Sequence, residues 1–435
     1  MRSIAIISRF TCPPAAPMPM PQRCSFFTAS LRPEADSPGP SAKDPIRMQT
    51  ISLNHPALEF CGAYEVQATP LGMMLRRLPQ RVTAQSPDPG LEVVANMPSG
   101  VRLTFRSDTQ QIALEVQEMA LQIKGEARLP MAFDLYADGA FVGTCLAAKG
   151  PTLVLDRMRM PPGVEITPGE ACTLHFDGLA PGMKTIEIWL PVCGSVELRG
   201  VRLDAGAAIE AAPAPARRWV HYGSSISHGM EAVSPAHTWP ATAARSAGLA
   251  LTNLGLAGQC QLDVGVARVI RDGRFDVISL KLGINVVNLD TMRERVFAPA
   301  VHGFLDTIRE GKPGTPIVIA SPIICPLAED HPGPTIPVKG GIRVHPRPPE
   351  LAYGALSLQR IREMLERIVA VRRGAGDHNL HYLNGLTLFG PEDVHDLPDG
   401  LHPNAAGLTR IGERFAAAVF GPGGLVPMIG AAGAV

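Results

Sequence analysis

Four short polar motifs in the C-terminal half of the sequence carry residue types that acyl transfer needs. The first is the turn Gly223-Ser224-Ser225-Ile226, the second contains Gly258, the third contains Asn285, and the fourth is Asp399-Gly400-Leu401-His402. A serine becomes a nucleophile when a base accepts its proton and nearby donors stabilise the oxyanion that forms. A histidine with an aspartate three residues earlier could supply that base in a fixed orientation.

Each motif by itself has a simpler structural explanation. The Gly-Ser-Ser sequence is a common turn, Gly258 could close a strand-to-helix loop, and Asn285 could cap a helix. Asp399 and Gly400 could form an ordinary turn, and His402 could be a solvated histidine. The order of the four motifs favours chemistry, because each of them follows an apolar run.

The segments around the motifs alternate between apolar runs and stretches with helical periodicity. The apolar runs cover residues 219–222, 249–256, 275–282, 316–324 and 380–388. Near-continuous apolar strands that alternate with helices predict a parallel sheet covered on both faces. Since the carboxyl ends of parallel strands share one edge of a sheet, the motifs would meet there. We therefore expect a three-layer α/β/α domain over residues 212–435.

The preceding segment, residues 48–211, has a different pattern. Apolar and polar residues alternate with a period of two over 101–105 and 112–116, and Asp138-Gly139 is a typical hairpin turn. This pattern predicts an all-β sandwich, jelly-roll-like in form. The small, proline-bearing stretch 205–216 would link it to the α/β domain.

The first 47 residues contain clustered prolines and no hydrophobic period, which predicts a disordered or artefactual leader. An organellar transit peptide and translation from Met48 are the alternatives. The apolar stretch 4–7 is too short for the core of a signal peptide, so we expect a cytoplasmic protein.

Charge and composition narrow the classes of partner. The 435 residues include 40 basic and 40 acidic side chains, which argues against nucleic acid or an anionic membrane as partner. No apolar run approaches the ~18 residues that a membrane span needs. The eight cysteines form no CxxC pair, so we expect neither a metal nor another cofactor. The oligomeric state is left open.

The order of the motifs resembles the SGNH (GDSL-type) hydrolase superfamily, which is named for a serine, a glycine, an asparagine and a histidine in four such blocks. The turn at 223–226 is similar to the Gly-Asp-Ser-Ile/Leu block, with Ser224 in place of its aspartate. Val286 follows Asn285 where the family often has another aspartate. The resemblance covers residues 217–420, and its two departures concern the substrate pocket more than the chemistry.

This resemblance implies a role for each matching residue. Ser225 would be the nucleophile, His402 the base, and Asp399 the acid that orients the base. The backbone N–H groups of Ser225 and Gly258 and the side-chain amide of Asn285 would stabilise the oxyanion.

Three further residues could line a substrate pocket, namely Ser224, His228 and Cys325. Ser224 is also an alternative nucleophile, although alignment on the following isoleucine favours Ser225. For His228, a structural or solvated role is the simpler interpretation. Cys325 follows the fourth apolar run without an assigned base, so we interpret it as pocket wall.

A β-sandwich ahead of an SGNH domain is similar to two known arrangements, the bacterial carbohydrate acetyl esterases and the salicylyl acyltransferases of polyketide tailoring. The resemblance implies a serine esterase that cleaves a small acyl ester through an acyl-serine intermediate, on a carbohydrate or a small-molecule alcohol. An acyltransferase that uses the same acyl-enzyme is the main alternative. A catalytically inactive carbohydrate-binding protein is a third.

Overall fold

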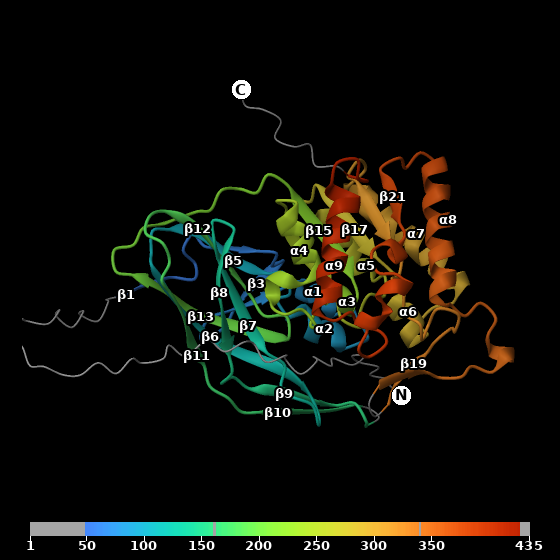
Figure 1. Cartoon of the computed structure of the whole chain (residues 1–435), viewed down its shortest axis with the longest axis horizontal. Helices are drawn as coiled ribbons and strands as arrows, with labels where there is room; N and C mark the ends of the chain where they lie inside the picture. The colour runs from blue at the N-terminus through green and yellow to red at the C-terminus, as the bar shows by residue number, and fades with distance from the viewer. Residues whose placement is uncertain (1–47, 160–161, 339–340, 427–435) are drawn as a thin grey trace, which may run out of the picture.

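The alternating sequence of the first half folds into two β-sheets that share one core (Figure 1). The computed structural model describes residues 48–159, 162–338 and 341–426, so the leader expected over residues 1–47 lies outside the described part. Leu114 and Val116 of one sheet and Leu103 and Phe105 of the other are fully buried in this core, as the period-two pattern predicts.

The first sheet has the strand order β10-β9-β6-β13-β4-β3, with β1 beside β13 and β11 beside β6, and all pairs are antiparallel except β6 with β9. Its strands are β1 (Met48–Ile51), β3 (Glu65–Ala68), β4 (Met73–Arg76), β6 (Gln111–Ile123), β9 (Thr152–Asp156), β10 (Gly163–Thr167), β11 (Cys172–Asp177) and β13 (Gly194–Asp204).

The second sheet is antiparallel, with the order β14-β5-β12-β7-β8 and β2 beside β5. Its strands are β2 (Glu59–Cys61), β5 (Arg102–Ser107), β7 (Met131–Ala137), β8 (Ala140–Ala147), β12 (Lys184–Trp189) and β14 (Ile209–Glu210). Two short helices, α1 (Gln80–Thr83) and α2 (Gly90–Ala95), interrupt the all-β pattern between β4 and β5.

The second half is built on a parallel five-stranded sheet with the order β16-β15-β17-β18-β21. The strands are β15 (Arg218–Gly223), β16 (Ala250–Gly255), β17 (Val277–Lys281), β18 (Ile317–Ala320) and β21 (Leu380–Leu383). A separate two-stranded hairpin consists of β19 (Thr335–Val338) and β20 (Gly341–Val344).

Helices cover both faces of the parallel sheet. One face packs against α5 (Val264–Asp272), α7 (Glu294–Gly311) and α8 (Leu358–Gly374), and the other against α4 (Trp239–Ser246) and α9 (Ala405–Phe415). The remaining elements are α3 (Ser225–His228), α6 (Ile284–Leu289), the 3₁₀ turns η1 (Pro235–His237), η2 (Pro349–Leu351), η3 (Gly385–Thr387) and η4 (Pro391–Asp396), and a π-helical turn η5 (Ala416–Phe420).

The observed architecture confirms the predicted fold class, a β-sandwich ahead of a three-layer α/β/α unit. The division into domains at residues 48–211 and 212–435 stays a prediction, because one hydrophobic cluster runs from the sandwich into the α/β half. No helix among the described residues is long and apolar enough to cross a membrane.

Candidate active site

The serine turn lies between β15 and α3, where the backbone is tightly packed. A Cβ atom on Gly223 would lie 2.4 Å from Ser227 Oγ, and one on Gly255 would lie 2.4 Å from the backbone nitrogen of His228. Glycine at the ends of β15 and β16 therefore lets α3 approach the sheet closely. The first residue of α3 is Ser225, which is buried at the edge where the parallel strands end.

A chain of hydrogen bonds joins three of the predicted residues. Ser225 Oγ lies 2.9 Å from His402 Nε2, and His402 Nδ1 lies 2.8 Å from Asp399 Oδ2. Asp399 Oδ1 also accepts the backbone N–H groups of Leu401 and His402 at 2.9 and 2.7 Å. The aspartate therefore holds both the loop and the imidazole, which leaves Nε2 facing the serine hydroxyl.

The electrostatic surroundings favour a basic imidazole. Burial lowers the pKa of His402, but the negative charges of Glu231 and Asp399 raise it above its ordinary value. Burial raises the pKa of Asp399, yet its hydrogen bond to His402 and its charge interaction with that residue lower it by more. His402 can thus accept a proton from Ser225 in a setting that stabilises the imidazolium.

Within the described ranges, the donors predicted to stabilise an oxyanion form no hydrogen bond to another protein group. Among the described residues, the backbone N–H groups of Ser225 and Gly258 donate to no protein acceptor. Asn285 Oδ1 accepts the N–H of Cys260 at 3.1 Å, which leaves its amino group available. Gly283, directly before α6, has φ of 118° and no room for a Cβ atom beside Ile361. This glycine lets α6 begin close to the sheet edge.

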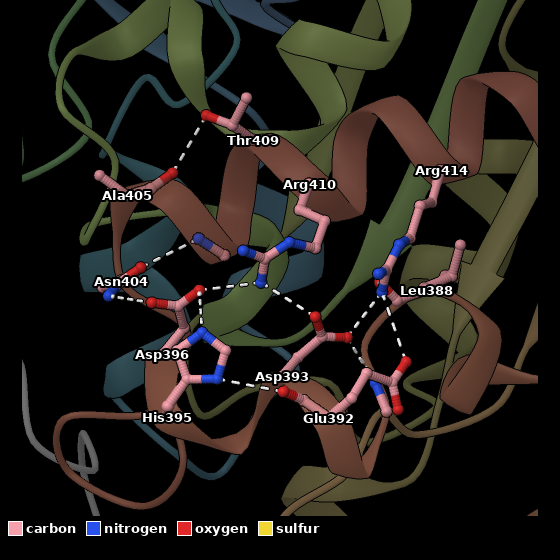
Figure 2. Close-up of polar contacts among 12 residues, drawn as sticks. Leu388, Glu392, Asp393, His395, Asp396, Asn404, Ala405, Thr409, Arg410 and Arg414 are labelled. Carbon is pink, nitrogen blue, oxygen red and sulfur yellow. Dashed lines mark hydrogen bonds and ion pairs between the residues drawn. The ribbon is translucent and has the colours of Figure 1, made fainter.

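A network of ion pairs fixes the loop that carries Asp399 and His402 (Figure 2). Arg410 of α9 donates to Asp393 and Asp396 of η4 at 3.0 and 2.8 Å, and Arg414 donates to Asp393 at 2.6 Å. Asn404, which caps α9, donates to Asp396 at 2.9 Å. The two ends of the loop are therefore held together by charged hydrogen bonds.

The three residues predicted for the pocket occupy different environments. Ser224 caps the start of α3 with its backbone carbonyl, and its hydroxyl is buried without a described hydrogen bond. Cys325 Sγ lies 3.3 Å from the carbonyl oxygen of Gly400, and burial raises its pKa to about 12, so the thiol is neutral. His228 is fully buried against the N-terminal half and does not line the cavity beside the serine.

Two buried charged groups near the site were missed from the sequence. Glu231 follows α3 by three residues, and both of its carboxyl oxygens are buried without a hydrogen bond among the described residues. Burial raises its pKa to about 7. Lys281 ends β17 and is also buried. A lysine inside an otherwise apolar run was a usable signal, whereas nothing in the sequence marked Glu231 as buried.

Metal chemistry has no obvious site in the part of the chain that the structure covers. No group of three or more His, Cys, Asp or Glu side chains within 48–159, 162–338 and 341–426 could hold a metal ion.

Comparison with known proteins agrees with this geometry. Residues 221–410 match the model of the GDSL-like Lipase/Acylhydrolase family. The structure of the salicylyl-acyltransferase SsfX3 from a tetracycline biosynthetic pathway is similar over both halves, with 31% identity, a TM-score of 0.71, and coverage of 84% of this chain and 95% of that chain. No curated protein sequence matches the chain.

More distant structures share the fold. A GDSL-like lipase from Bacteroides ovatus is 19% identical with a TM-score of 0.60, covering 85% of this chain and 96% of that one. A family two carbohydrate esterase from Cellvibrio japonicus is 13% identical with a TM-score of 0.53, with coverage of 85% and 96%.

Proposed function

The chain belongs to the GDSL-like lipase/acylhydrolase family, and we propose that it cleaves a small acyl ester through an acyl intermediate on Ser225. It is an ester hydrolase or a related acyltransferase. The observation that carries the assignment of residues is the hydrogen-bonded series from Ser225 Oγ through His402 to Asp399.

In the first half-reaction, Ser225 Oγ attacks the acyl carbonyl carbon and His402 Nε2 takes the hydroxyl proton. Asp399 holds Nδ1–H of the imidazole and stabilises the imidazolium. The backbone N–H groups of Ser225 and Gly258 and the amide of Asn285 donate to the oxyanion. When the tetrahedral intermediate collapses, the alkoxide leaves with the proton from His402, and the acyl group stays on Ser225.

In the second half-reaction, a hydroxyl compound attacks the acyl-serine while His402 takes its proton. The bond between the acyl carbon and Ser225 Oγ then breaks, and His402 returns the proton to Ser225 Oγ. Water gives a free acid, and this hydrolysis is the activity that we propose. An alcohol gives a new ester, and this acyl transfer is the second candidate activity, which the 31% identity with an acyltransferase supports. The alcohol that is released or acylated would be a carbohydrate or a small molecule, because the fold is shared with carbohydrate esterases.

A nitrophenyl acetate assay tests the acyl-enzyme directly. We expect wild-type protein to release nitrophenol in a burst equal to the enzyme concentration if deacylation is slower than acylation, and Ser225→Ala to release none. Ser224→Ala should retain a measurable burst. The reverse result for the two serines would move the nucleophile by one residue.

A second assay separates water from alcohol as acceptor. Wild-type protein is given nitrophenyl acetate with glycerol or a sugar alcohol, and the products are analysed for a new ester. A transferred ester that is absent with Ser225→Ala would support acyl transfer, and free acetate alone would support hydrolysis. A wild-type protein that neither cleaves the ester nor becomes acylated would contradict both activities.

A further inference from the structure

A groove lies where α1 of the N-terminal half meets α5 of the α/β half. A Cβ atom on Gly265 of α5 would lie 2.8 Å from Val82 Cγ1 of α1, so the two helices pack closely at this point. The volume of the groove is about 160 Å³. Because a water molecule takes up about 30 Å³ of the liquid, the groove has room for about five waters or for one small polyatomic ion.

Three arginines line this groove. Arg81 belongs to α1, whereas Arg268 and Arg271 lie three residues apart on α5, which puts them on the same side of that helix. The other lining residues are Val82, Gln85, Gly265 and Asp272. Like charges at this spacing repel one another, so the group of arginines is unfavourable unless negative charge lies among them.

The acids around the groove are bonded to only one of the three arginines. Arg271 Nε and Nη2 donate to Asp272 at 2.7 and 3.3 Å, and Arg271 Nη1 donates to Glu310 at 2.9 Å. The hydrogen bonds from Arg271 lower the pKa of Asp272, and the charge of Arg81 contributes, so Arg81 lies close to this pair. Within the described ranges, neither Arg81 nor Arg268 forms a hydrogen bond or an ion pair through its side chain, and both are exposed.

A tetrahedral oxyanion suits this arrangement better than a carboxylate does. Guanidinium groups donate in planar forks to carboxylate and to phosphate oxygens. Arg81 and Arg268 line the groove from different helices, and a phosphate group can present oxygens to both of them. A carboxylate, by contrast, presents both of its oxygens on one side. A doubly charged anion would also offset the charge of both arginines.

We propose that the groove binds a phosphate group between Arg81 and Arg268, either as the free ion or as a monoester of a small molecule. The bound phosphate connects α1 to α5, and therefore the N-terminal half to the α/β half. The groove shares no lining residue with the proposed active site. This binding site is thus a property of the protein beyond the proposed ester cleavage.

Equilibrium dialysis of the full chain against radiolabelled inorganic phosphate tests the site directly. We expect one phosphate per chain. The binding should persist at about 0.15 M sodium chloride, where the attraction of scattered surface charges is largely screened. Ser225→Ala should bind phosphate as wild type does, because the groove lies apart from the serine.

Arg81→Gln and Arg268→Gln should each weaken the binding. A hydrogen bond to a charged group corresponds to roughly a 10- to 100-fold change in affinity, so we expect the dissociation constant of phosphate to rise by that factor in either variant. Arg295→Gln is the matched control, because Arg295 is an exposed arginine of α7 that does not line the groove. The control should bind phosphate as tightly as wild type.

Wild-type protein that binds no phosphate, or loses it at that salt concentration, would overturn the inference. Equal affinity in wild type and in both groove variants would also overturn it, because the phosphate would then lie elsewhere. Glycerol 1-phosphate as a competitor distinguishes the source of the group. Displacement of the labelled phosphate supports a monoester as ligand, and no displacement supports the free ion. Ester cleavage enters none of these measurements, so a negative result leaves the proposed function of Ser225 intact.

Discussion

Two acidic side chains raise the pKa of the His402 imidazole in different ways. Asp399 forms a hydrogen bond to Nδ1, while Glu231 acts by its charge from a position without described hydrogen bonds. Both raise the pKa of His402, and the charge of Arg157 opposes them. A second buried acid therefore contributes to the basicity of the proposed base.

The pH profile of ester cleavage should report this contribution. Catalysis needs neutral His402, so kcat/KM falls as the pH decreases through the pKa of His402, which lies above its ordinary value of 6.5. Burial raises the pKa of Glu231 to about 7, so its negative charge is present mainly above that pH. Glu231→Gln removes this charge, which lowers the pKa of His402 and moves the acidic limb to lower pH. Measurement of kcat/KM from about pH 5 to about pH 9 would show this shift, because histidine side chains titrate within that interval.

Exposed Glu366 on α8 provides the control, because Glu366→Gln should leave the acidic limb where it is in wild type. If Glu231→Gln lowers the rate equally at every pH, then Glu231 supports the structure and does not tune the base.

The side-chain amide of Asn285 should contribute to the rate and little to substrate binding. Removal of one oxyanion donor typically lowers kcat by about 10²–10³. We expect a loss of this order for Asn285→Ala in the steady-state cleavage of nitrophenyl acetate, with a similar KM. Asn379→Ala, at an exposed residue that bonds the carbonyl of Gly314, should keep the wild-type rate. An unchanged kcat in Asn285→Ala would remove Asn285 from the site.

Ion pairs between η4 and α9 hold the two ends of the loop that carries the proposed acid and base, Asp399 and His402. Asp393 accepts from Arg410, from Arg414 and from the backbone N–H of Gly390, and its side chain is 4% exposed. Three donors lose their acceptor in Asp393→Ala. We expect the free energy of unfolding to fall by about 1–3 kcal/mol, measured by urea denaturation, with a lower kcat.

The neighbouring acid offers a direct comparison. Glu392 is 65% exposed and lies 4.0 Å from Arg414, so Glu392→Ala should change stability by less than about 1 kcal/mol. A similar loss of unfolding free energy in both variants would mean that the buried network around Asp393 stabilises the protein no more than the exposed contact of Glu392 does.

The sequence predicted the presence of each parallel strand better than the residue at which the strand ends. The run 316–324 contains β18, which ends at Ala320, and the run 380–388 contains β21, which ends at Leu383. The apolar pattern continues because the chain stays buried after the strand, as with Ile323 and Leu388. A pattern of buried residues therefore cannot separate a strand from the packed loop that follows it.

In the molecule as a whole, buried Arg77 of the N-terminal half binds residues that surround the serine turn of the α/β half. This buried arginine donates to the carbonyls of Val94, Asn253 and Gly255 at 2.7, 3.0 and 2.6 Å. It also donates to His228 Nδ1 at 3.2 Å. His228 Nε2 then donates to the carbonyl of Val192 at 2.8 Å, which fits a neutral imidazole, since burial holds the pKa of His228 far below its ordinary value.

Loss of Arg77 should therefore weaken both halves together. In Arg77→Met, three buried carbonyls lose a charged donor at about 1–3 kcal/mol each, so we expect a loss of more than about 3 kcal/mol in unfolding free energy and reduced esterase activity. Arg106, which pairs with Glu210 at the surface, is the control, and Arg106→Met should cost less than about 1 kcal/mol. Thermal melting followed by tryptophan fluorescence would measure both, and equal melting temperatures would contradict the prediction.

These contacts mark the limit of what the sequence could predict. Ser225, Asp399 and His402 belong to motifs with recognisable spacing, whereas Arg77 lies 151 residues from its contact His228. No local pattern distinguishes a buried arginine that binds main-chain carbonyls from an exposed one. Similarly, the burial of Lys281 and Glu231 near the site depends on residues that are distant in the sequence.

The contacts of Arg77 with main-chain carbonyls restrict which sequence changes a protein with these two halves can accept. Because the partners of Arg77 are mainly backbone carbonyl groups, most side chains around the turn could be substituted without loss of these hydrogen bonds. A chimera with a foreign sandwich, by contrast, would need a guanidinium at this point and a hydroxyl where Ser99 bonds the carbonyl of His228. The two halves should therefore be inherited as a matched pair and resist recombination with other modules.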